Sequence, residues 1–197
     1  MDHTAQDRWD ERYASGSYTP RDTPSELVTA WLPRLRGGRA LDVATGAGRH
    51  ALAMAAAGFE VEAVDISEVA IQTARVRARE LDLEVDWQVA DLTEVTLPSG
   101  RYDLITVLRY RDPQLWPRLR HALAPGGWLI VEHHLRTHLD DAGGPSDDAF
   151  RLAPGELLDA FGDLRVVRYD ERVEPADRGH ERFVLASLVA CAGDPGW

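Results

Sequence analysis

The residues best suited to bind a ligand lie in the stretch 40–67. An apolar run ends at Asp42, a turn of small residues and an Ala-rich helical pattern follow, and a second such run ends at Asp65. Gly46 and Gly48 in the turn let a ligand approach the backbone closely, and the following helix offers unsatisfied N–H groups there. Asp65 stands about 20 residues after Gly46, where a carboxylate can accept hydrogen bonds from both ribose hydroxyls of a nucleoside cofactor. The stretch therefore predicts a nucleoside-binding crevice at the carboxyl ends of two strands.

Two classes of cofactor fit this geometry. Gly46, Gly48 and Ala51 spell G-x-G-x-x-A, a spacing that also occurs in dinucleotide-binding folds. Asp42, however, places a carboxylate just before the loop, and a carboxylate repels a pyrophosphate but attracts an ammonium group. S-adenosylmethionine carries such an ammonium group, a ribose for Asp65 and a cationic sulfonium. The loop therefore favours S-adenosylmethionine over NAD.

The elements that must position these residues alternate along the chain. Five short β-branched runs separate longer helical patterns, which indicates a parallel sheet with crossover helices. These predicted strands span residues 40–44, 60–65, 84–90, 102–108 and 128–134. Two further runs, 164–173 and 182–191, follow each other around a turn at 175–179 and predict an antiparallel hairpin. We therefore expect a three-layer α/β fold with a Rossmann-like doubly wound sheet, mostly parallel, that ends in an antiparallel C-terminal hairpin.

Ser67 begins the clearest helical pattern. Its side chain can cap a helix over 67–81, and Glu68 suits the positive N-terminal end of that helix. The apolar positions of the pattern share one face, and they are Ile71, Ala74, Ala78 and Leu81. We expect this face to lie against the sheet.

These motifs together resemble those of class I S-adenosylmethionine-dependent methyltransferases. The family pattern acidic-x-G-x-G-x-G matches the loop, with Ala44 in place of the first Gly. Asp91 and Leu92 follow the third predicted strand, where the family has its adenine-contacting acidic residue, and Ile66 is the apolar residue after the ribose-binding position. Similar matches cover the fourth strand and the turn into the fifth. The resemblance implies a cofactor site made of Asp42, Ala44, Gly46, Gly48, Asp65, Ile66, Asp91 and Leu92.

Residues 1–36 hold two short helical patterns before the first predicted strand, and we interpret them as a helical lid on a domain that spans 37–197. The motifs RWDERY at 8–13 and PSE at 24–26, together with Arg49, resemble a small-molecule branch that includes tellurite-resistance and thiopurine methyltransferases. In that branch the N-terminal segment folds over the cofactor, and Arg49 would join the cofactor site. The likeness implies three aromatic residues that cover the sulfonium and the substrate, where aromatic faces favour a cation: Trp9, Tyr13 and Tyr18.

The acceptor side of the predicted site follows the fourth and fifth strands. Arg109, Tyr110 and Arg111 form the rim that faces the transferable methyl group in this fold, and two arginines suit an anionic substrate. Tyr110, His133 and His134 are the candidate general bases if the acceptor is a hydroxyl or an amine. A soft anion such as a thiolate, selenide or tellurite needs only positioning. Although the two histidines and a third further on have the spacing H-H-x-x-x-H, we predict no metal site.

The composition limits the partners. Acidic residues outnumber basic ones by 33 to 22, every basic residue is arginine, and the net charge is −11. That balance repels nucleic-acid backbones and anionic lipid. The single cysteine, Cys191, excludes an intrachain disulfide, and no apolar stretch approaches a signal peptide or a membrane span. We expect a cytoplasmic monomer or homodimer without nucleic-acid or membrane partners.

The sequence thus predicts methyl transfer from S-adenosylmethionine to a small-molecule acceptor, such as a thiol, a chalcogen oxyanion or another small nucleophile. Three alternatives stay open at this point. An NAD-dependent oxidoreductase predicts dinucleotide binding, and a methyltransferase that acts on nucleic acid or protein predicts a basic groove. A non-catalytic protein would bind S-adenosylmethionine without turnover.

Overall fold

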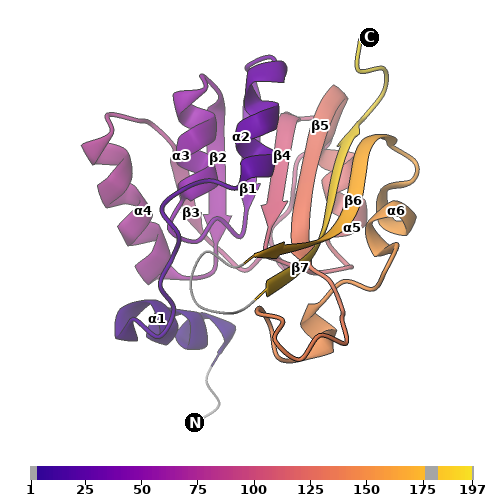
Figure 1. The fold of residues 1–197 in the computed structure, drawn as a ribbon. Helices are drawn as coiled ribbons and strands as arrows, with labels where there is room; N and C mark the ends of the chain where they lie inside the picture. Colours follow the sequence, from indigo (N-terminus) through magenta and orange to yellow (C-terminus); the bar gives the residue numbers. More distant parts are fainter. Residues whose placement is uncertain (1–3, 176–181, 197) are drawn as a thin grey trace.

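The computed structural model describes residues 4–175 and 182–196, and the strands of this part of the chain form one seven-stranded sheet (Figure 1). The strand order is β3-β2-β1-β4-β5-β7-β6. The strands are β1 Arg39–Val43, β2 Glu60–Asp65, β3 Asp86–Val89, β4 Tyr102–Leu108, β5 Leu123–His134, β6 Arg165–Pro175 and β7 Arg182–Cys191. The first five pair in parallel, whereas β7 is antiparallel to both β5 and β6. The predicted mostly parallel sheet with an antiparallel C-terminal hairpin is confirmed.

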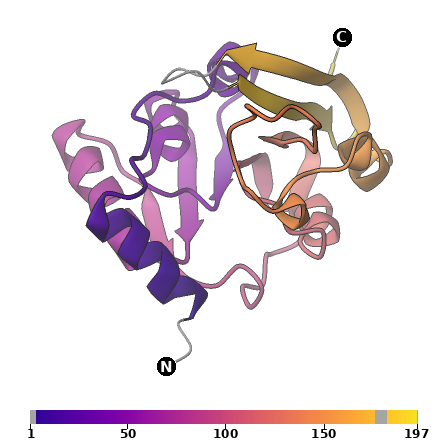
Figure 2. The same ribbon diagram turned by 60° about the horizontal axis from the view of Figure 1, so that its bottom comes forward.

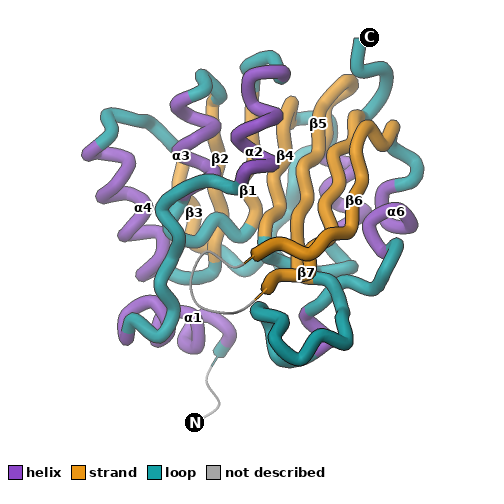
Figure 3. Tube along the Cα trace, viewed as in Figure 1, coloured by secondary structure: helices purple, strands orange, loops and turns teal. Residues whose placement is uncertain are grey.

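Helices cover both faces of this sheet (Figures 1 and 3). They are α1 Ala5–Ser15, α2 Glu26–Trp31, η1 Leu32–Arg34, α3 Arg49–Ala56, α4 Glu68–Glu80, α5 Trp116–Ala122, η2 Asp148–Phe150 and α6 Glu156–Phe161. Residues from α2 and α3 belong to one buried apolar cluster, and residues from α5 and α6 belong to a second one. Two helical layers with a sheet between them give the three-layer architecture. None of the described helices is long and apolar enough to cross a membrane.

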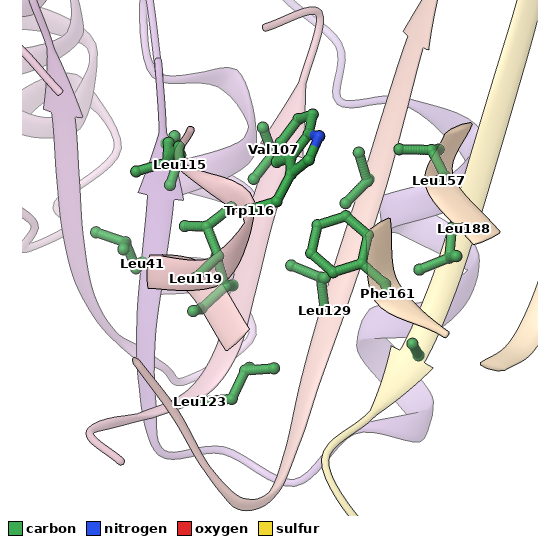
Figure 4. Close-up of a cluster of buried hydrophobic side chains, with 14 of the residues drawn as sticks. Leu41, Val107, Leu115, Trp116, Leu119, Leu123, Leu129, Leu157, Phe161 and Leu188 are labelled. Atoms are coloured by element: carbon green, nitrogen blue, oxygen red, sulfur yellow. The ribbon is translucent and has the colours of Figure 1, made fainter. Parts of the chain in front are cut away.

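The second cluster shows how the sheet is anchored (Figure 4). Trp116 of α5 and Phe161 of α6 lie edge to face, with ring centroids 5.4 Å apart. Leu41, Leu129 and their neighbours on the strands cover these rings from the sheet side. Each such buried side chain contributes roughly 1.5–3 kcal/mol, so the strand ends that carry the site are held rigidly.

Helix α4 begins as predicted, because the Ser67 hydroxyl accepts a hydrogen bond of 3.1 Å from the Ala70 N–H. Three of the four expected core positions on this helix are buried. Leu81 is not, since 58% of its surface is exposed. The helix ends at Glu80, and the chain then turns away through Asp82, whose φ is 53°. The prediction for Leu81 was therefore wrong.

Several element boundaries differ from the prediction. The strand expected at 84–90 covers only Asp86–Val89, because β3 is an edge strand that pairs with β2 alone. The strand expected from 128 starts earlier, at Leu123. The hairpin turn was expected at 175–179. Pro175 ends β6, and positions 176–179 lie outside the described residues.

The two halves of the N-terminal segment behave differently. Helix α1 has no buried residue and lies across the carboxyl end of the parallel strands, beside α4 (Figures 1 and 2). In α2, by contrast, Leu27, Val28 and Trp31 are buried, and the Trp31 ring lies 5.6 Å from that of Trp128. Helix α2 therefore belongs to the body of the protein, and only the part before it remains a candidate lid.

Candidate functional site

A cavity of about 290 Å³ lies where β1, β2 and β4 end, underneath α1. Crevices at the carboxyl ends of parallel strands are the usual ligand sites of doubly wound sheets. Residues from the glycine loop, from the ends of β2 and β4 and from α1 line it together. The structure thus brings most of the sequence-predicted cofactor residues to one place.

The glycine loop takes left-handed backbone conformations at three positions. Ala44, Gly46 and Gly48 have φ values of 53°, 56° and 82°. Gly46 lines the cavity, and a Cβ there would lie 2.6 Å from the Tyr13 hydroxyl. A Cβ at this position would displace the Tyr13 side chain and strain the backbone, so glycine suits the close approach of α1.

Gly48 has a different reason to be glycine. A Cβ there would lie 2.5 Å from the Trp87 ring of β3 and 2.9 Å from the Ala74 Cβ of α4. Gly48 is not among the described residues that line the cavity. Gly48 thus makes room for the Trp87 ring, and its expected role in admitting a ligand stays a prediction.

Asp42 lies beneath the loop rather than in the cavity. Only 1% of its surface is exposed, and its carboxylate accepts hydrogen bonds from the hydroxyls of Thr45 at 2.5 Å and Thr106 at 2.6 Å. The Ala51 N–H donates a further bond of 3.1 Å. Burial raises the pKa of Asp42 to about 6. Asp42 thus holds the loop in place, and its expected contact with an ammonium group stays a prediction.

Asp65 faces the cavity at the end of β2. Its carboxylate accepts hydrogen bonds from the backbone N–H groups of Gly46 at 2.7 Å and Ser67 at 2.9 Å. Burial raises its pKa above the usual value, while these donors act in the opposite direction. The two backbone bonds fix the orientation of the carboxylate before any ligand arrives.

Ile66, Asp91 and Leu92 line the same part of the cavity as Asp65, which we call the nucleoside end. Asp91 Oδ1 also accepts hydrogen bonds from Thr93, at 2.9 Å from its N–H and 2.8 Å from its hydroxyl. Asp91 thus caps a turn and faces the cavity at once. Both interpretations of this residue fit the structure.

The aromatic residues of the N-terminal segment form one cluster over the cavity. Tyr13 lies 6.2 Å from Trp9 and 5.2 Å from Tyr18, measured between ring centroids, and all three line the cavity. Burial holds the pKa of Tyr13 well above its usual value, so its phenol stays neutral. A neutral phenol above the loop is a hydrogen-bond donor for a ligand.

Hydrogen bonds from the start of α3 help to attach the segment after α1 to the body, as does an ion pair of 2.7 Å between Asp22 and Arg77 of α4. Arg49 donates a hydrogen bond of 3.1 Å to the Thr23 carbonyl. His50 Nε2 accepts one of 3.2 Å from the Ser25 N–H, and burial holds the pKa of His50 well below its usual value. Arg49 and His50 both line the cavity, so the start of α3 joins the lid to the site.

Three arginines that line the cavity interact electrostatically with one another, and we call them the arginine end: Arg21, Arg49 and Arg109. Arg109 adopts a φ of 65°, and its Nη2 lies 3.3 Å from the buried Glu132 carboxylate. Its buried Nη1 has no hydrogen-bond partner among the described residues. The guanidinium groups of Arg21 and Arg109 lie 5.0 Å and 5.7 Å from the Phe183 ring.

The other two residues predicted at the acceptor rim lie in different places. Tyr110 lines the cavity, and burial raises its pKa to about 12, which makes it a poor base at neutral pH. Arg111 turns away, because its guanidinium pairs with Glu156 at 2.8 Å and 3.0 Å and bonds the Ala149 carbonyl. Arg111 was expected at the acceptor rim, but it does not line the cavity.

The two candidate histidine bases lie behind the cavity rather than in its wall. His133 Nε2 donates to the Phe150 carbonyl at 2.6 Å, and burial lowers the pKa of His133 to about 4. His134 lies against the Phe183 ring, and burial lowers its pKa to about 2. In the described part of the chain, neither histidine lines the cavity.

Sequence reasoning missed several lining residues. They are Ala5, Pro20, Arg21, Thr45, Ala47, His50, Thr93 and Leu108. Thr45, Ala47 and His50 lie within or directly after the glycine loop, so the motif could have predicted that they line the cavity. Arg21 is the important omission, because it reaches the cavity only through the path of the chain after α1. Across residues 4–175 and 182–196, no group of three His, Cys, Asp or Glu residues could hold a metal ion.

Comparison with known proteins agrees with this geometry. Residues 40–127 match a family described as a methyltransferase domain. The chain is 31% identical over 179 residues to the ubiquinone biosynthesis O-methyltransferase of Bordetella bronchiseptica, covering 86% of this chain and 70% of that protein. The ubiquinone biosynthesis O-methyltransferase of Coxiella burnetii is 35% identical over 158 residues, which cover 76% and 66% of the two chains.

Solved structures with the same fold include TehB from Haemophilus influenzae. Its TM-score is 0.75 at 21% identity, over 92% of this chain and 66% of that one. A structure that concerns conversion of a disulfide bond into a thioacetal group during echinomycin biosynthesis gives 0.74 at 19% identity, over 98% and 94%. The fold, the site geometry and these relatives agree: the chain belongs to the S-adenosylmethionine-dependent methyltransferases.

Proposed function

We propose that the protein transfers the methyl group of S-adenosylmethionine to a small anionic acceptor. The observation that carries the proposal is the arginine end of the cavity, with a buried guanidinium nitrogen of Arg109 that lacks a partner among the described residues. A buried, unpaired donor on a charged group is costly, and an anionic ligand group would remove that cost. The small, covered cavity favours a small molecule over a nucleic acid or a protein segment.

The nucleoside end fits the adenosine part of S-adenosylmethionine. Asp65 would accept hydrogen bonds from the ribose hydroxyls, because its carboxylate already faces the cavity in a fixed orientation. Ile66 and Leu92 offer apolar surface for the adenine ring, and Asp91 offers a hydrogen-bond acceptor beside it. The cofactor supplies a methyl group that its sulfonium has already activated.

The charges along the cavity support an anionic acceptor. In the described part of the chain, the acidic residues that line it are Asp65 and Asp91, and both belong to the nucleoside end. The other end combines three guanidinium groups with one buried carboxylate, Glu132, which Arg172 also binds at 2.6 Å. One arginine would suffice for the carboxylate of the cofactor, so positive charge remains for the acceptor.

The catalytic work assigned to the chain is alignment and exclusion of water. The arginine end would hold the acceptor in line with the methyl group, and the aromatic cluster of α1 would cover both molecules. Tyr110 keeps its proton at neutral pH and would donate a hydrogen bond rather than act as a base. An anionic nucleophile needs no general base, and we assign none.

A methyl-transfer assay with acceptors of different charge tests the proposal. We expect turnover with small anions, thiolates and chalcogen oxyanions among them, and much weaker turnover with neutral compounds of the same shape. Arg109→Gln should raise the KM for the active anion about tenfold. Arg36→Gln, which removes an exposed arginine elsewhere, should leave KM unchanged. A preference for neutral acceptors, or an unchanged KM in Arg109→Gln, would refute the anionic acceptor.

A further inference from the structure

Helix α1 is held on the body by surface contacts. It has no buried residue, so the apolar burial that fixes other helices contributes little to its position. Its neighbour is α4, and the two meet where α4 begins (Figure 2). The polar contacts at that meeting point therefore decide whether α1 stays in place.

Asp10 makes two of these contacts. Its Oδ1 accepts a hydrogen bond of 2.6 Å from the Ser67 hydroxyl and one of 3.2 Å from the Val69 N–H. The first N–H groups of a helix have no partner inside the helix, and a carboxylate there also interacts favourably with the helix dipole. Asp10 thus adds from α1 a second acceptor at the start of α4, for the Val69 N–H, beside the cap that Ser67 supplies to Ala70.

The contact leads directly to the nucleoside end. Ser67, which donates its hydroxyl to Asp10, also donates its backbone N–H to Asp65 at 2.9 Å. Asp65 in turn accepts from the Gly46 N–H, and Tyr13, one turn after Asp10, lies directly over Gly46. A closed path of contacts therefore runs from α1 through the turn after β2 to the glycine loop and back to α1.

We propose that Asp10 is a positioning residue that couples the docking of α1 to cofactor binding, through its hydrogen bonds to Ser67 and Val69. The inference rests on the proposed role of Asp65 as the ribose ligand. Because such coupling is reciprocal, a bound cofactor holds α1 docked, and a docked α1 slows cofactor release. The same contact would keep Trp9 and Tyr13 over the methyl group.

The first test compares two variants on the same helix. Asp10→Asn removes the carboxylate charge at the contact, and Glu11→Gln removes an equal charge from the exposed neighbouring position. By calorimetry, we expect Asp10→Asn to weaken binding of S-adenosylhomocysteine about five- to tenfold, and Glu11→Gln to change it by less than about twofold. Stopped-flow displacement should show that the loss in Asp10→Asn lies mainly in faster release.

A double-variant cycle separates coupling from general destabilisation. The combination of Asp10→Asn with Ser67→Ala should weaken S-adenosylhomocysteine binding by less than the sum of the two single losses, because Asp10→Asn weakens, and Ser67→Ala removes, the same hydrogen bond. Additive losses would overturn the inference. The inference would also be overturned if Asp10→Asn lowers the unfolding temperature of the cofactor-free protein but leaves the affinity for S-adenosylhomocysteine unchanged. That result would show that Asp10 has a structural role only.

Failure of the proposed ribose site would look different. In that case Asp65→Ala would bind S-adenosylhomocysteine as well as the wild type does. If Asp65→Ala loses affinity while Asp10→Asn behaves like Glu11→Gln, the ribose site stands and only the coupling through Asp10 is refuted.

Discussion

The nucleoside end and the arginine end of the cavity are built in different ways. At the nucleoside end, backbone N–H groups from one local motif hold Asp65. At the arginine end, Arg21, Arg49 and Arg109 come from three separate segments, and one buried nitrogen lacks a partner in the described structure. The carboxylate of the first end is held by backbone donors, whereas the second end keeps a buried donor without a partner among the described residues. Cofactor recognition can therefore be shared across relatives while the acceptor differs.

Replacing Asp65 by Ala should separate the two ends most clearly. We expect the affinity for S-adenosylhomocysteine to fall about 10- to 100-fold, because the variant loses one or two charge-assisted hydrogen bonds. Calorimetry measures this change. Asp86→Ala, at an exposed position of β3, serves as the control. An unchanged affinity would mean that the nucleoside end does not bind the ribose.

A pH series should reveal the cost of the neutral histidine behind the arginine end. The folded pKa of His133 is lowered to about 4, so the unfolded chain binds more protons between pH 6.5 and 4 and stability falls as the pH decreases through this window. Urea unfolding at pH 6.5 and at pH 5 measures the free energy of unfolding. Between these two pH values, the free energy of unfolding of His133→Gln should decrease by roughly 1–2 kcal/mol less than that of the wild type. The exposed His121→Gln is the control. Parallel pH curves for wild type and His133→Gln would contradict the lowered pKa.

Arg109→Gln should affect only the arginine end. Alongside the expected tenfold rise in acceptor KM, affinity for S-adenosylhomocysteine should stay within about twofold of the wild-type value. Calorimetry and steady-state kinetics on one preparation test both statements. An equal loss in both quantities would show that the two ends are one site, and the contrast between them would fail.

Ala44→Gly should give the smallest effect. Ala44 holds a φ of 53°, a conformation that costs a residue with a Cβ roughly 1 kcal/mol. Glycine relieves this strain but has more freedom in the unfolded chain, so we expect a net stabilisation of about 0.5 kcal/mol. Ala57→Gly at the end of α3, where φ is −84°, should instead destabilise slightly. Urea unfolding distinguishes the two signs, and a destabilised Ala44→Gly would contradict the strain.

The sequence predicts the strands and the nucleoside end well because both depend on local patterns. The ends of β2 and β4 and the position of Asp65 follow from periodicity and from one motif. Asp42 and Gly48 show what local patterns do not predict. The motif explains why an acidic residue and a glycine stand there, but it does not predict which residues of other elements they contact. Whether a carboxylate meets a ligand or two threonines depends on Thr106, a residue of another strand.

The arginine end was less predictable for a physical reason. Arg111 follows Arg109 closely in sequence, yet an ion pair with Glu156 of α6 turns it away from the cavity. Arg21 has no motif of its own and arrives through the fold of the lid. His133 and His134 end the expected strand and are buried, His133 with its hydrogen bond to Phe150 and His134 against the Phe183 ring of β7. Residue spacing in the sequence does not predict which distant residue a side chain will bind.

The contact between Gly48 and Trp87 connects the glycine loop to the edge of the sheet. β3 has four residues and pairs only with β2, so it is among the strands that open most readily in local fluctuations. Each opening would withdraw the Trp87 ring from under the loop. Amide hydrogen exchange in the loop should therefore follow exchange in β3, and an edge strand that does not line the cavity would set how long the loop remains ordered.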